Sequence, residues 1–193
     1  MSLSLFSTLT TPQSRQTAGF SIVELMITIS IIVLVTGLVL ARYSSFNNSV
    51  LLQAQAFEIG FDIRQAQQTA ISVQAAESAS RNGFGIHFDT SHPNQYIFFE
   101  DLNNNGEFDD GTGIADDETL NAFLIDTRFE IVGIRTGSGS MTPRNEVSIT
   151  YRRPNFDGRI RPNGEIVEID IATGPDAPVR TIRVTQTGQI TIQ

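Results

Sequence analysis

The sequence predicts an α+β protein in which a long N-terminal α-helix packs on a C-terminal antiparallel β-sheet domain. Three observations lead to this fold class. An apolar run occupies residues 20–41, and apolar side chains then recur at helical spacing over residues 52–73. From residue 83 onward the chain consists of short β-branched runs separated by turn residues. At 193 residues, the chain has room for one such sheet domain and the helix that precedes it.

The first half of the predicted helix has the length and polarity of a membrane span. Residues 20–41 would extend about 33 Å as a helix, which is enough to cross the hydrocarbon core of a bilayer. Glu24 is the only charged side chain in this run. A lone carboxylate in a membrane segment is costly, so it is usually paired or functional. The preceding residues 1–19 are rich in serine and threonine and contain one charge, Arg15.

Residues 42–75 predict an amphipathic continuation of the same helix. Apolar positions follow one another at steps of three and four, which places them on one face. They are Leu52, Ala56, Ile59, Ile63, Ala66, Ala70 and Val73. Polar residues are expected mostly on the other faces, namely Gln53, Gln55, Glu58, Asp62, Gln65 and Gln67. No proline interrupts the chain between residues 19 and 91, so we expect one helix from about residue 20 to about residue 73.

Residues 76–193 predict the sheet domain. Six runs alternate apolar and polar residues or are rich in β-branched residues, and they occupy residues 84–88, 95–100, 122–134, 146–153, 165–173 and 180–192. Turn residues such as Ser138-Gly139 separate the runs, and Thr187-Gly188 predicts a closing hairpin inside the last one. Because no helical pattern lies between the runs, we expect an antiparallel sheet packed on the amphipathic half of the helix.

The composition excludes several kinds of chemistry. The chain has no cysteine, so it forms neither disulfides nor thiolate metal sites. It also has no lysine, and all 13 basic residues are arginine, which excludes Schiff-base catalysis. The 21 acidic residues give a formal net charge of −8, which disfavours binding of nucleic acid or anionic lipid through overall charge.

The acid is concentrated in residues 100–118, which hold eight of the 21 carboxylates and no arginine. Oxygen-bearing groups alternate there as in a calcium loop, and the candidate ligands are Asp101, Asn103, Asn105, the carbonyl of Glu107, and Asp109. Position twelve of such a calcium loop, counted from Asp101, is Thr112 instead of a bidentate glutamate. Asp110 or an acidic residue at 116–118 would then have to complete the coordination shell. The same residues suit a surface loop built from Asx turns, so calcium binding and a structural loop remain alternatives.

No catalytic site is predicted. His87 lies in a strand and His92 in a turn, and neither is accompanied by a nucleophile elbow, a metal-binding histidine pair or a phosphate loop. We therefore expect no enzymatic activity and no required cofactor, with Ca²⁺ the one ion under consideration.

Arginines gather between residues 135 and 161 with aromatic residues among them, a combination that can track a nucleic-acid strand. The candidates are Arg152, Arg153, Arg159 and Arg161. The alternative is that these arginines pair with the acidic loop of the same chain or of a neighbouring chain.

The residues around Glu24 resemble a known processing signal. The stretch GFSIVELMITISIIVLV, which begins at Gly19, closely resembles the class III signal of type IV prepilins and type II secretion pseudopilins. The resemblance implies that a prepilin peptidase cleaves between Gly19 and Phe20, removes residues 1–19 as a leader, and N-methylates Phe20. It also implies that Glu24 meets the N-terminal amine of a neighbouring subunit during filament assembly. The F-x-D-x-N-x-N-G-x-x-D segment at 99–109 is similar to that of H-type pseudopilins and T-type minor pilins.

On this resemblance, the expected protein is a structural subunit of a type IV pilus or a type II secretion-like filament. It would cross the bacterial inner membrane once, with its sheet domain in the periplasm or outside the cell. Its partners would be the prepilin peptidase, other pilin or pseudopilin subunits, and the inner-membrane assembly platform with its ATPase. The alternatives are a minor pilin that acts as a DNA-uptake receptor or adhesin, and a signal-anchored envelope protein with another role.

Overall fold

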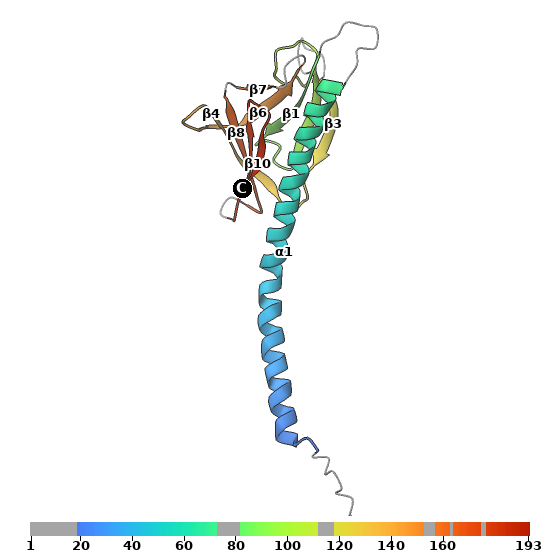
Figure 1. Ribbon diagram of the computed structural model, residues 1–193, viewed down its shortest axis with the longest axis vertical. Coiled ribbons are helices and arrows are strands. Elements are labelled where there is room, and N and C mark those ends of the chain that lie inside the picture. The colour runs from blue at the N-terminus through green and yellow to red at the C-terminus, as the bar shows by residue number, and fades with distance from the viewer. Residues whose placement is uncertain (1–18, 73–81, 112–117, 153–156, 163, 175–176) are drawn as a thin grey trace, which may run out of the picture. The chain divides into compact units, whose positions relative to one another are not determined.

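The computed structural model describes residues 19–72, 82–111, 118–152, 157–162, 164–174 and 177–193. In this part of the chain it contains one helix, α1 (Ile22–Ser72), followed by ten β-strands (Figure 1). The protein is therefore α+β, as predicted, and the helix bounds agree with the predicted ones to within two residues. The chain divides into two units, Met1–Ser44 and Ser45–Gln193, and α1 contributes to both.

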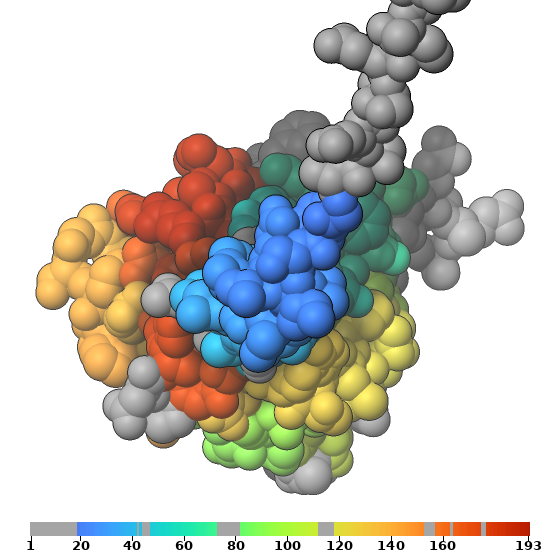
Figure 2. All heavy atoms as spheres, turned by 90° about the horizontal axis from the view of Figure 1, so that it is seen from below, coloured from blue at the N-terminus to red at the C-terminus, as the bar shows by residue number. Residues whose placement is uncertain are grey.

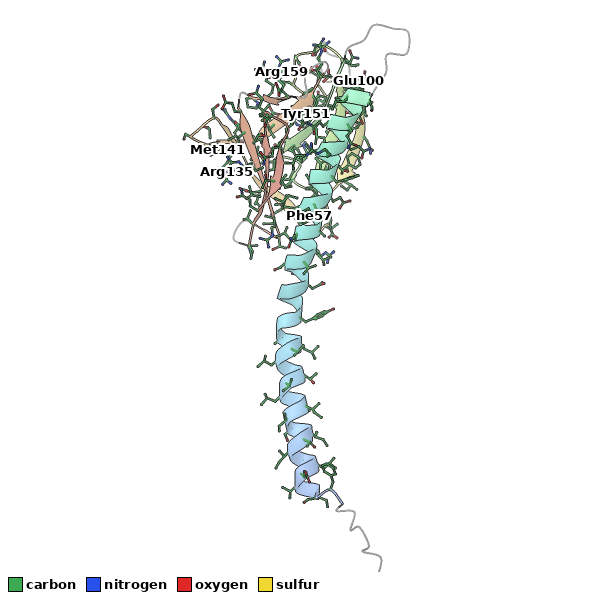
Figure 3. The ribbon with its side chains drawn as sticks, viewed as in Figure 1. Phe57, Glu100, Arg135, Met141, Tyr151 and Arg159 are labelled. Carbon is green, nitrogen blue, oxygen red and sulfur yellow. The ribbon has the colours of Figure 1, made fainter. Side chains whose placement is uncertain are left out.

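The first unit contains the apolar half of α1. Apolar side chains are exposed all round the helix along Ile22–Ala41 (Figure 3). The two hydroxyl groups in its first turns donate to the helix's own backbone, Thr28 to the Leu25 carbonyl at 2.8 Å and Ser30 to the Met26 carbonyl at 2.7 Å. They therefore require no partner outside the helix. By length and composition the segment suits a membrane span, and an N-terminal signal sequence has the same properties.

The second unit contains the amphipathic half of α1, whose predicted stripe is buried in the hydrophobic core. Its members there are Leu52, Ala56, Ile59, Ile63, Ala66 and Ala70, and Val73 lies outside the described residues. Gln55 and Gln67 were expected on other faces, but both are buried. Gln55 accepts a hydrogen bond from the Asp126 amide at 3.1 Å, and Gln67 accepts one from Arg64. Hydrogen bonds of this kind allow a polar side chain to lie beside an apolar stripe.

Two five-stranded antiparallel sheets follow, where the sequence predicted one. The first has the order β3 (Thr119–Leu124), β2 (Gln95–Asp101), β1 (Gly83–Asp89), β6 (Glu146–Tyr151), β7 (Gly158–Arg161). The second has the order β10 (Ile190–Ile192), β9 (Arg180–Thr185), β8 (Ile166–Ala172), β4 (Glu130–Gly137), β5 (Thr142–Arg144). The predicted closing hairpin is confirmed as β9–β10. Strand β3 is an exposed edge, coloured yellow in Figure 2.

The run 122–134 was wrongly predicted as a single strand. It forms the end of β3 in the first sheet and the start of β4 in the second. Between them the Asp126 carboxylate accepts a hydrogen bond from the Arg128 amide at 3.0 Å, and the Asp126 carbonyl accepts one from Phe129 at 2.8 Å. Such an Asx-type turn reverses the chain. The short strands β5 and β7 were not predicted.

The inner faces of both sheets and the stripe of α1 form one hydrophobic core. Ile86 and Ile149 contribute from the first sheet, and Ile169 and Ile182 from the second. The buried Tyr96 of β2 donates its hydroxyl to the Asp62 carboxylate on α1 at 2.5 Å. This core leaves the opposite face of the first sheet free to carry a loop.

Candidate functional site

The predicted processing residues lie at the start of α1. Gly19 and Phe20 precede the helix, are not helical themselves and are exposed, with 78% of Phe20 accessible. Apart from the chain neighbours of Gly19, no atom of the described residues lies within 4 Å of where a side chain at this position would begin. Glu24 lies in the first turn of α1 and is exposed. The positive end of the helix dipole favours a carboxylate there.

The acidic loop, defined here as the described residues 102–111, folds back across the outer face of the first sheet. Two small polar residues of β6 form hydrogen bonds with the loop. Ser148 accepts a hydrogen bond from the Phe108 amide at 3.2 Å, and Thr150 donates to the Gly106 carbonyl at 3.1 Å. Both side chains are buried, so their hydrogen bonds with the loop satisfy polar groups that solvent does not reach. The loop is therefore held by contacts distant in sequence.

A small aromatic cluster lies beneath the loop. The Phe108 ring packs edge-on against the buried Phe99 of β2, with centroids 5.5 Å apart, and lies 5.0 Å from the ring of His87. Phe99 fits because its cross-strand neighbour is Gly85, where a Cβ would lie 2.8 Å from the Phe99 ring. Aromatic pairs of this geometry add stability beyond the area they bury. Phe108 thus anchors the loop.

Two buried carboxylates hold the base of the loop. Asp101 accepts a hydrogen bond from the Gly106 amide at 3.0 Å. Glu118 accepts one from the Leu102 amide at 2.8 Å and another from the Asp109 amide at 3.1 Å. Burial raises the pKa of both carboxyl groups above the ordinary value, although these amides favour the ionised form. One oxygen of Asp101 is buried without a hydrogen-bond partner among the described residues.

The remaining candidate calcium ligands form Asx turns. Asn103 accepts a hydrogen bond from the Asn105 amide at 2.9 Å, and Asn105 accepts one from the Glu107 amide at 2.6 Å. Both asparagine side chains donate to Asp109, at 2.7 and 3.0 Å. Among the described residues, no three His, Cys, Asp or Glu side chains are grouped to hold a metal ion. These contacts form the structural loop that the sequence left as an alternative, and calcium binding stays a prediction.

Arg159 joins the acidic loop to β7. Its guanidinium donates to the Asn104 carbonyl at 3.1 Å, and its stem packs on Gly106, where a Cβ would lie 2.7 Å from the arginine Cδ. Gly106 also has a φ of 82°, which favours glycine. Of the other predicted nucleic-acid residues, Arg152 is exposed, Arg161 is half-buried, and Arg153 lies outside the described residues. For Arg159, therefore, the contact is with the acidic loop of its own chain.

Two residues that organise this site were not predicted from the sequence. Phe108 is the only aromatic residue inside an acidic loop, which is the signal that could have marked it as an anchor. Glu118 was considered only as a spare calcium ligand, yet it accepts two backbone amides. Nothing in the local sequence indicates which amides it reaches.

The fold and these sites define an α+β protein whose N-terminal apolar helix is followed by antiparallel β-sheets, as in membrane-anchored or secreted proteins. Comparisons with protein-family models, with curated proteins and with solved structures found no match.

Proposed function

We propose that this protein is a structural subunit, a pilin or pseudopilin, of a type IV pilus or a type II secretion-like filament. The observation that carries the proposal is the Gly19-Phe20 junction and Glu24 at the start of one continuous helix, Ile22–Ser72. The helix is apolar all round in its first part and one-sided in the second, where its stripe is buried under sheets. Such a chain suits a membrane-inserted precursor whose apolar helix is later buried among its neighbours.

The environment of the junction supports processing at this point. A peptidase requires an accessible peptide bond, and Gly19 and Phe20 are exposed and outside the helix. Cleavage creates an ammonium group on Phe20, four residues before the Glu24 carboxylate. Two opposite charges on neighbouring chains can offset the cost of burying each alone in an apolar filament core. In this mechanism the protein works by assembly and has no enzymatic activity.

Exposed aromatic residues on α1 offer a second contact for a neighbouring subunit. Phe57 and Phe61 are 56% and 69% exposed and line a groove with Ile190 and Ile192 at the edge of the second sheet. Exposed apolar surface of this kind favours protein contacts. The assembly platform, its ATPase and the inner-membrane location follow from the same proposal.

Mass spectrometry of the N-terminus tests the proposal. The full chain is co-expressed with a prepilin peptidase, and the expected product begins at Phe20 and carries one added methyl group. Gly19→Val should block this cleavage, whereas the control Gly37→Ala changes a glycine of the same apolar run and should leave it intact. A wild-type chain that keeps residues 1–19 beside an active peptidase would contradict the proposal.

A further inference from the structure

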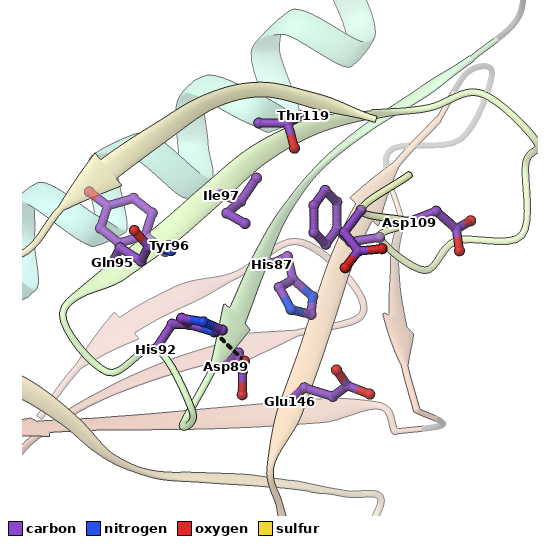
Figure 4. A pocket seen from close by; sticks show the side chains of 11 residues that line it. His87, Asp89, His92, Gln95, Tyr96, Ile97, Asp109, Thr119 and Glu146 are labelled. Atoms are coloured by element: carbon purple, nitrogen blue, oxygen red, sulfur yellow. Dashed lines mark hydrogen bonds and ion pairs between the residues drawn. The ribbon is translucent and has the colours of Figure 1, made fainter. Parts of the chain in front are cut away.

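A cavity of about 420 Å³ opens on the outer face of the first sheet, beside the acidic loop (Figure 4). Strands β1, β2, β3 and β6, the β1–β2 turn and the loop all contribute to its lining. This volume lies within the range of ordinary small-ligand pockets. Asp109 and Asp110, which the sequence offers as calcium ligands, line part of it, and its other lining residues have no predicted function.

The charges that line this cavity are unbalanced. In the part of the chain that the structure describes, four carboxylates line it, and they belong to Asp89, Asp109, Asp110 and Glu146. No arginine of the described ranges lines it, and the one exposed base among the described lining residues is His92, which lies 2.8 Å from the Asp89 carboxylate. The Glu146 carboxylate is exposed and has no hydrogen-bond or ion-pair partner within the described ranges. A concave surface with this excess of negative charge attracts cations.

His87 lies in the interior of the cavity and is only 9% exposed. Its Nδ1 is 3.0 Å from the Ser148 hydroxyl, which already accepts the Phe108 amide. The buried hydroxyl hydrogen therefore needs an acceptor, and Nδ1 is the one within reach. This network assigns the ring proton to Nε2, leaving a donor that no described residue accepts. Burial lowers the pKa of His87 to about 4, so the ring is neutral at pH 7 and does not repel a cation.

We propose that this cavity binds the guanidinium group of an arginine on a partner polypeptide. A guanidinium presents five donors to carboxylates and a flat face to aromatic rings. The rim supplies the carboxylates, and the rings of Phe108 and His87 supply a wall. A peptide carbonyl beside the arginine can accept the His87 Nε2 proton. The proposal does not depend on filament assembly.

The test uses the full chain in uncharged maltoside micelles with ¹³C-labelled histidine. Because the chain has only two histidines, the ring spectrum is simple, and a His92→Gln sample assigns it. The probe is the peptide acetyl-Gly-Arg-Gly-amide, titrated into the millimolar range. The control probe replaces arginine with citrulline, which keeps the shape and removes the charge. We expect a saturable shift of the His87 signal with the arginine peptide and none with the citrulline peptide.

Two matched variants separate the cavity from overall charge. Glu146→Gln should raise the dissociation constant about fivefold. Glu165→Gln removes one charge from an exposed position outside the cavity and should leave the constant unchanged. Equal binding of both peptides, no His87 shift, or equal weakening by the two variants would each overturn the proposal. Unchanged histidine signals in the free variants show that the fold is intact.

Discussion

His87 should make the sheet domain less stable in mild acid. Burial holds its pKa near 4, against 6.5 for an ordinary histidine, so the folded protein disfavours the charged ring. The nearby Asp89 opposes this shift and His92 adds to it, but burial dominates. The contribution of the neutral His87 ring to the free energy of unfolding is fully present above pH 6.5 and is lost as the pH falls toward 4. It is lost because, in this range, the unfolded chain binds a proton at His87 that the folded chain does not.

The size of the effect follows from the two pKa values. Between pH 7 and pH 5 the free energy of unfolding should fall by about 2 kcal/mol through this group alone. The appropriate comparison is His87→Phe, which keeps a ring against Phe108 and removes the titration. The variant loses the Ser148 contact, but that loss is the same at every pH.

The assay is urea unfolding of both proteins in maltoside micelles, followed by circular dichroism at several pH values. Both proteins keep the other titratable groups around the cavity, which are Asp89, His92, Asp109, Asp110 and Glu146, so the comparison isolates the change at His87. The free energy of unfolding of the wild-type chain minus that of His87→Phe should fall by about 2 kcal/mol from pH 7 to pH 5. Parallel curves over this range would refute the reasoning, since His87 would then titrate alike in the folded and unfolded chains.

Three further predictions concern the core, the loop and the helix. Ile63→Ala removes a fully buried side chain and should lower the free energy of unfolding by about 2–5 kcal/mol in the same urea assay. The control Gln65→Ala changes an exposed residue and should alter the free energy of unfolding by less than about 0.5 kcal/mol. Equal effects of the two variants would contradict the assigned helix face. Phe108→Ala should speed hydrogen exchange of the loop amides and leave those of β8 slow, and an unchanged loop would show that Phe108 is not its anchor. Glu24→Gln should permit leader removal but prevent recovery of the protein in sedimented filaments. The control Glu165→Gln, which changes an exposed residue of the second unit outside the groove at Phe57, should assemble. Normal filaments from Glu24→Gln would exclude the assembly role of Glu24.

The helix could be predicted in detail because its signals are local. Leu52, Ile59 and Ile63 recur at helical spacing, and a stripe of that width has one stable solution, which is burial against another layer. Most of the strands could be located for the same reason, since alternation is read within a few residues, whereas the short β5 and β7 were not predicted. The closing hairpin needed only the turn residues before Gly188, whose φ of 79° favours glycine.

The division into two sheets could not be predicted from local pattern. Ile125 and Phe129 flank the Asp126 turn, and both are buried, so the apolar pattern continues across the point where the chain leaves one sheet for the other. The buried glutamines show the same limit. Gln55 can be buried because its side chain accepts a hydrogen bond from the Asp126 amide, which is distant in sequence.

The position of the acidic loop likewise depends on distant partners, and this changes the interpretation of the arginines. By composition, Arg159 is a basic residue near aromatic ones and suits nucleic acid. In the fold its guanidinium donates to the Asn104 carbonyl and its stem packs on Gly106, beside a loop rich in carboxylates. A phosphate would have to compete with that contact and approach a negative surface. Arg159 is therefore less available to a phosphate than the sequence suggests, which counts against its predicted role in nucleic-acid binding.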